Sequence, residues 1–162
     1  MGGAPARADA FADWVRPHLA GMARLAARLA PDADRDDVVQ EALARAWVKR
    51  RQYDQARGTP SAWLLAIVAD QAGKARRRLR ALRPAGELTD RPGPAAPTEQ
   101  YLDIERAVRG LPERQRLAVN CFYFAGLSVA ETAAVMRCAE GTVNSTLADA
   151  HARLRPLLEV AG

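Results

Sequence analysis

The segment from Leu111 to Leu154 constrains the fold of this chain more than any other part of it. It reads LPERQRLAVNCFYFAGLSVAETAAVMRCAEGTVNSTLADAHARL. A short helix is predicted from Pro112, a second from the capping box that begins at Ser128, and a third from about Glu140. The few residues left between the second and third helices predict a tight turn, the arrangement of a helix-turn-helix. A plain helical hairpin in a bundle remains the alternative.

The apolar positions of this segment predict how its helices pack. The second helix has its apolar side chains at helical spacing, and the third helix offers a matching stripe. We expect Ala130, Thr132, Ala133, Val135 and Met136 to pack on Val143 and Leu147.

Composition predicts an all-α protein. Of the 162 residues 49% are hydrophobic and 27% charged, with abundant alanine and arginine, which favour helix. No alternating run of β-branched residues predicts a strand, and no apolar run is long enough for a membrane span. We expect a cytoplasmic chain without a signal peptide, in which Cys121 and Cys138 are small core side chains, a disulfide being the less favoured alternative. No enzyme motif occurs, so no catalytic residue, metal or cofactor is expected.

The distribution of proline and glycine along the chain predicts two helical domains, residues 1–83 and 99–162. Between them, residues 84–98 contain four prolines and two glycines, which indicates a flexible linker. In the first domain a helix is expected over about 8–29, kinked or ended by Pro17. A second helix is capped by Asp34 and runs to about Arg51, and a third begins at Thr59-Pro60.

Charge is divided unevenly between the two domains. The net charge is +5, but residues 1–83 hold 16 basic and 9 acidic residues, against 7 and 8 in residues 99–162. Six of the basic residues fall within 74–83, where there is no acidic residue. A polyanion is therefore expected to bind the N-terminal domain more strongly than the helix-turn-helix domain.

Two sets of motifs, one in each predicted domain, resemble a known family. LPERQR, GLSVAETAAVM, EGTV and RLR closely resemble region 4 of bacterial RNA polymerase sigma factors of the extracytoplasmic-function (ECF) group. DRDDVVQEALARAW and RGTPSAWLLAIVADQAGKARRRLR resemble the polymerase-docking and promoter-melting helices of region 2. The resemblance implies a non-enzymatic factor that joins core polymerase at the β′ clamp coiled coil and the β flap and directs it to promoter DNA. It also suggests an anti-sigma factor as a partner.

The resemblance assigns roles to individual residues. A polymerase-docking ridge would comprise Asp36, Asp37, Gln40, Glu41 and Arg45. Contacts to the promoter −10 element would come from Tyr53, Arg57, Thr59, Ser61, Lys74, Arg76, Arg77, Arg78 and Arg80. Contacts to the −35 element would come from Arg137, Thr142, Asn144, Ser145, Thr146 and Arg153. Trp47 and Trp63 are expected in the core rather than stacked on bases.

The chain also departs from the family pattern. Arg137 stands where a turn glycine is usual, Ala139 replaces a capping serine, and Asn144-Ser145-Thr146 replaces Lys-Ser-Arg. In region 2, Asp70 stands where asparagine is frequent and Lys74 where aspartate is frequent. A weaker −35 contact is therefore expected. Two alternatives stay open: an adaptor or decoy that binds polymerase or an anti-sigma factor without reading promoters, and a stand-alone helix-turn-helix regulator.

Overall fold

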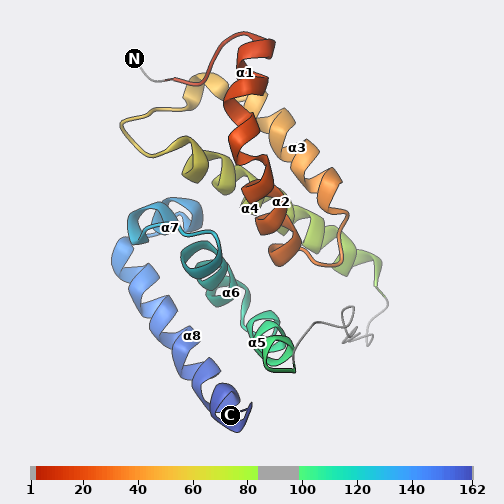
Figure 1. The fold of residues 1–162 in the computed structure, drawn as a ribbon, viewed down its shortest axis with the longest axis vertical. Helices are drawn as coiled ribbons and strands as arrows, with labels where there is room; N and C mark the ends of the chain where they lie inside the picture. The colour runs from red at the N-terminus through yellow and green to blue at the C-terminus, as the bar shows by residue number, and fades with distance from the viewer. Residues whose placement is uncertain (1–2, 84–98, 162) are drawn as a thin grey trace.

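Helices make up all the regular structure that the computed structural model describes, over residues 3–83 and 99–161 (Figure 1). The predicted linker lies outside the described residues. The N-terminal half contains α1 (Ala8–Val15), α2 (Leu19–Leu29), α3 (Arg35–Val48) and α4 (Pro60–Leu82), with 3₁₀ turns η1 (Arg16–His18) and η2 (Arg50–Gln52). The C-terminal half contains α5 (Glu99–Arg109), α6 (Glu113–Val119), the π-helical segment η3 (Asn120–Phe124), α7 (Val129–Met136) and α8 (Glu140–Ala161).

The predicted helix boundaries follow from local capping chemistry. The Asp34 side chain accepts hydrogen bonds from the backbone N–H groups of Asp36 and Asp37, at 2.9 and 3.1 Å. Thr59 Oγ1 accepts from the Ala62 N–H at 3.1 Å, and Pro60 is the first residue of α4. These bonds satisfy N–H groups that a helix N-terminus leaves unpaired. The expected break at Pro17 is confirmed, since η1 separates α1 from α2.

The N-terminal half has a core built from α1 to α4. Its fully buried side chains include Met22, Leu25, Leu64 and Val68, and the alanines of α3 and α4 let the helices approach closely. Trp47 and Trp63 pack against this core, as expected, while part of each ring stays exposed.

The helix-turn-helix is confirmed, but its packing differs from the expectation at two positions. Ala133 and Met136 pack with Val143 and Leu147 as predicted, and residues 137–139 form the turn. Ala130 is exposed, and Val135 joins the core of the N-terminal half instead. The periodicity of α7 shows which side chains are apolar, but it does not show that a second helix, α4, packs on the opposite flank.

The two halves are packed against each other. Helix α7 packs against α4 (Figure 1), and η3 contacts α2. Cys121, Leu127 and Val135 from the C-terminal half belong to the core of the N-terminal half. Cys121 is fully buried and Cys138 partly buried, both as free thiols, and burial raises the pKa of Cys121 to about 12.

Candidate polymerase and nucleic-acid interfaces

The predicted polymerase-docking residues share one exposed ridge of α3. Their spacing by about one helical turn places them side by side. Asp37 and Glu41 also border a shallow cavity of about 220 Å³ that Arg78 of α4 lines from the other side. The members of the ridge, all exposed, are Asp36, Asp37, Gln40, Glu41 and Arg45. The acidic and amide groups of the ridge are therefore exposed while the two halves are packed against each other, an arrangement called closed below.

The loop that precedes α4 carries the predicted pocket for an unstacked base. Arg57 and Thr59 are exposed and Ser61 is partly exposed. Tyr53 is buried, with its ring against Trp14 and Trp63, and its hydroxyl donates a 3.1 Å hydrogen bond to the Gly58 carbonyl. Burial raises the pKa of this phenol, and the charge of Asp54 adds to the effect. In this structure Tyr53 shapes the loop and does not present its ring to a ligand.

The basic run of α4 is divided between solvent and the second half of the chain. The side chains of Arg77, Arg78 and Arg80 are exposed. Arg76 is only 14% exposed and forms a 3.0 Å ion pair with Glu113 at the start of α6. Lys74 pairs with Asp70 one turn earlier, at 3.6 Å. Arg77, Arg78 and Arg80 are thus the α4 cations that remain most open to phosphate groups.

The recognition helix α8 exposes few charges where region 4 is expected to meet DNA. Thr142, Asn144 and Ser145 are exposed, and so is Arg153. The hydroxyl groups of Ser145 and Thr146 donate to backbone carbonyls one turn earlier, including 2.7 Å from Thr146 to Thr142. These bonds occupy the hydroxyl protons, so both groups can only accept hydrogen bonds from a ligand.

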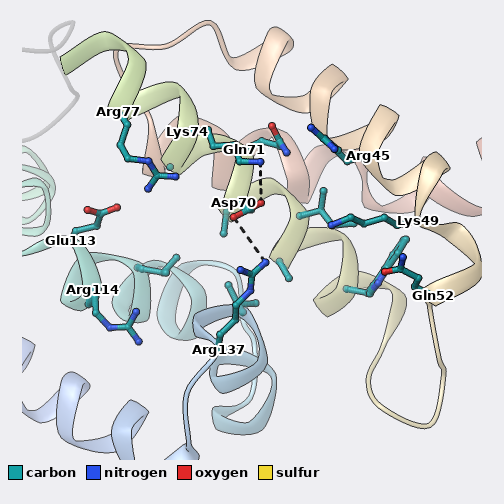
Figure 2. A pocket seen from close by; sticks show the side chains of 17 residues that line it. Arg45, Lys49, Gln52, Asp70, Gln71, Lys74, Arg77, Glu113, Arg114 and Arg137 are labelled. Carbon is teal, nitrogen blue, oxygen red and sulfur yellow. Dashed lines mark ion pairs between the residues drawn. The ribbon is translucent and has the colours of Figure 1, made fainter. Parts of the chain in front are cut away.

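The predicted −35 residue Arg137 lies at the boundary with the N-terminal half. It ends α7 in the left-handed conformation, with φ of 56°. Its guanidinium lies 4.0 Å from the Asp70 carboxylate of α4 (Figure 2). In this arrangement Arg137 reaches toward the N-terminal half, while 78% of its side chain stays exposed.

A basic cavity lies between the two halves, and the sequence did not predict it. Its volume is about 390 Å³, and its walls come from α3, α4, α6 and α7 (Figure 2). Asp70 and Glu113 are its two acidic residues, whereas its cationic residues number six: Arg45, Lys49, Lys74, Arg77, Arg114 and Arg137. An excess of positive charge therefore lines the boundary between the two halves.

Arg28 of α2 forms the most extensive polar contact between the halves, and sequence reasoning did not find it. Its Nη1 donates to Glu105 of α5 at 3.0 Å, and its Nε donates to the side chain of Asn120. Its guanidinium also stacks on the Phe124 ring, 3.3 Å from the centroid. Arg28 and Glu105 are each 18% exposed. No sequence signal joins these residues, because 77 and 92 positions separate Arg28 from its two partners.

Two negative findings apply to the described parts of the chain. Residues 3–83 and 99–161 include no helix that is both long and apolar enough to cross a bilayer. The same residues include no group of three or more His, Cys, Asp or Glu side chains placed to hold a metal ion.

Comparison with known proteins gives matches in both halves. The Sigma-70 region 2 model matches residues 14–83, and the Sigma-70 region 4 model matches residues 101–154. The ECF RNA polymerase sigma factor SigM of Mycobacterium tuberculosis is 38% identical, over 92% of this chain and 77% of its own length. EcfG of Rhodopseudomonas palustris is 31% identical, over 95% and 88%.

Solved structures match across both halves at once. The sigma factor RpoE of Bartonella quintana, in complex with the anti-sigma factor NepR, has a TM-score of 0.73 and 26% identity, over 93% of this chain and 97% of that one. CnrH, in complex with the cytosolic domain of CnrY, has a TM-score of 0.72 and 25% identity, over 96% and 92%. The fold, the order of the two regions and the level of identity agree: this chain belongs to the ECF group of the sigma-70 family of RNA polymerase sigma factors.

Proposed function

We propose that this protein binds core RNA polymerase and directs it to promoters, without itself being an enzyme. The observation that carries the proposal is the coexistence of a region 2 half and a region 4 half in family order, in a chain 38% identical to SigM over most of both proteins. The polymerase performs the chemistry, and this chain supplies the binding free energy that holds the polymerase at a promoter. Its proposed place of action is the cytoplasm, where RNA polymerase works.

The exposed ridge of α3 is the proposed docking site for the β′ clamp coiled coil. It presents Asp36, Asp37, Glu41 and the amide of Gln40 at the surface, next to Arg45. Acidic and amide groups complement a basic partner helix, which favours specificity and rapid association. All five side chains of the ridge are exposed while the two halves are packed together, so polymerase can reach them in this arrangement.

Helix α4 and its preceding loop are the proposed −10 surface. The exposed cations Arg77, Arg78 and Arg80 supply attraction to phosphates, and the loop residues Arg57, Thr59 and Ser61 lie next to the start of the helix. Phosphate contacts provide affinity and salt dependence, whereas base contacts provide sequence choice. Region 4 is proposed to bind the −35 element through the exposed face of α8 and the polymerase through the β flap.

An anti-sigma factor is a further proposed partner. One structure that matches nearly the whole chain is of the sigma factor RpoE bound to the anti-sigma factor NepR, and another is of CnrH in complex with the cytosolic domain of CnrY. The likeness covers both halves together, so this chain has the domain arrangement seen in those complexes.

The docking proposal is tested by binding to purified core polymerase. We expect Gln40→Ala/Glu41→Ala to weaken binding at least about tenfold, because it removes two polar groups of the proposed interface. Both side chains are exposed, so their loss leaves the core packing of α3 intact. The matched control is Asp9→Ala, which removes an exposed acid on α1. Equal binding by the double variant and the control contradicts the assigned ridge.

The DNA proposal is tested with the holoenzyme at several salt concentrations. Arg77→Gln/Arg78→Gln is expected to weaken promoter binding more than Arg153→Gln/Arg155→Gln, which removes the same charge from α8. The slope of log K against log[salt] should fall by about 0.9 for each lost phosphate contact. Equal or reversed effects refute the assignment of α4. Polymerase binding with no promoter-directed initiation favours the adaptor alternative.

A further inference from the structure

The basic cavity between the two halves has the size and the charge of a site for a small anion. Its volume of about 390 Å³ falls within the range of about 300–1,000 Å³ that is usual for small-molecule sites. Six cationic and two acidic residues line it, an excess of four positive charges. A ligand that matches this lining is compact and carries several negative charges.

The two carboxylates of the cavity leave most of its cations without a partner. Asp70 lies 3.6 Å from Lys74 and 4.0 Å from Arg137, both longer than the about 2.7–2.9 Å of a charge-assisted hydrogen bond. Glu113 forms its 3.0 Å ion pair with Arg76, which does not line the cavity. The other four cations of the cavity have no carboxylate within 4.0 Å among residues 3–83 and 99–161: Arg45, Lys49, Arg77 and Arg114. Their N–H donors are therefore available to an external anion.

In the closed arrangement these cations reach the cavity from facing walls. Lys74 and Arg77 are on α4, whereas Arg114 of α6 and Arg137 of α7 come from the other half of the chain (Figure 2). A DNA strand that follows α4 needs the cations of that helix alone, but a small anion in the cavity can contact both walls at once. The convergence of the two walls therefore favours a compact ligand.

Arg137 stands at the cavity in a backbone conformation that favours glycine. Its φ of 56° lies in the left-handed region, where the Cβ atom crowds the following carbonyl oxygen. The side chain is 78% exposed, so its 4.0 Å contact with Asp70 contributes little to offset this strain. Strained residues cluster at functional sites, where the surrounding structure holds them for a purpose other than stability. A guanidinium that binds an anion accounts for an arginine at this position.

From these observations we infer that the cavity binds an oligophosphate, either free or as the phosphate chain of a nucleotide. Four of its cations are arginines, whose planar guanidinium groups bind phosphate oxygens through pairs of parallel hydrogen bonds. Trp63 and Ile67 precede Lys74 and Arg77 on one stripe of α4, so this wall changes from apolar to cationic along the helix. That order suits a molecule with a flat ring at one end and phosphates at the other.

A bound oligophosphate would compete with promoter DNA, because Lys74 and Arg77 are also proposed −10 residues. Only this consequence rests on the proposed function. Binding of the oligophosphate itself requires the cavity alone, and it is measured below on the free protein without DNA or polymerase.

The test is isothermal titration calorimetry of the free, full-length protein in magnesium-free buffer, with inorganic tripolyphosphate and GTP as the two probes. The variant is Arg114→Gln/Arg137→Gln. The matched control is Arg106→Gln/Arg109→Gln, which removes the same charge from exposed positions of α5. We expect the variant to bind tripolyphosphate at least about tenfold more weakly than the wild type, and the control to stay within about twofold.

Arg137→Gly separates binding from stability. Glycine adopts a φ of 56° without strain, so this change should raise the thermal midpoint by a few degrees. The same change should weaken tripolyphosphate binding at least about threefold, because it removes one guanidinium of the site. A loss of binding in a more stable protein cannot come from damage to the fold.

The two probes distinguish the sources of the phosphate chain. Tighter binding of GTP identifies a nucleotide with its base on the apolar part of the wall, whereas equal or tighter binding of tripolyphosphate identifies a free oligophosphate. Binding of neither probe at about 1 mM overturns the site. Equal losses in the Arg114/Arg137 variant and the α5 control, or unchanged binding by Arg137→Gly, also overturn it.

Discussion

Replacing Arg28 with methionine should weaken the contact between the two halves of this protein by about 3 kcal/mol. Methionine keeps an unbranched stem of similar length, so the change removes the charge and the N–H donors. Arg28 donates to Glu105 and to Asn120, which is 1% exposed, and stacks on Phe124. A hydrogen bond to a charged group contributes about 1.5–3 kcal/mol, and a buried polar group left unpaired costs about 1–3 kcal/mol.

The assay for Arg28→Met is urea unfolding followed by circular dichroism. The control is Arg24→Met on the same helix, where the arginine is exposed and the expected change is within about 0.5 kcal/mol. A double-mutant cycle with Glu105→Gln should give a coupling free energy of at least about 1 kcal/mol, because both side chains of the pair are 18% exposed. Equal stability of the two methionine variants, or a coupling near zero, refutes the packed interface.

Three further outcomes follow from local structure. Ser128→Ala should lower the free energy of unfolding by about 0.5–2 kcal/mol, because it removes the hydroxyl that caps α7, and an unchanged urea midpoint contradicts this. Gly73→Ala should raise the thermal midpoint by a few degrees, since a Cβ would make only an ordinary 3.5 Å contact with the far end of the Arg77 side chain and a mid-helix glycine costs about 1 kcal/mol; a lower midpoint would argue against it. Hydrogen bonds hold the pKa of Glu131 below its unfolded value, so the stability that its carboxylate contributes is fully present above the unfolded pKa and is lost as the pH falls through the folded pKa. Acid should therefore lower the free energy of unfolding of the wild type more than that of Glu131→Gln.

The helix boundaries were predictable because capping is local. Asp34, Thr59 and Ser128 each bond to an N–H group two or three residues ahead, and such spacing is visible in the sequence. The recognition of both sigma regions likewise rests on short continuous motifs. The residues of the α3 ridge came from the resemblance to region 2, and all of them are exposed in the structure.

The interface between the halves was not predictable from the same information. Thr59 and Glu131, whose side chains form a hydrogen bond with each other, are 72 positions apart. Each residue also caps its own helix, so the sequence gives no reason to expect a bond between them. The periodicity of α7 placed Val135 in the wrong core, because one apolar stripe can serve two neighbouring helices. Tyr53 was predicted at the −10 surface, yet its neighbours Trp14 and Trp63 enclose it, a grouping that arises only when α1, α4 and the loop fold together.

The most direct test of the central claim is in vitro transcription with purified core polymerase on fragmented genomic DNA, with the RNA 5′ ends mapped. With the wild-type protein we predict discrete start sites that core polymerase alone does not give and that Gln40→Ala/Glu41→Ala strongly reduces. A protein that binds core polymerase tightly yet yields no additional start site on any fragment would contradict the account.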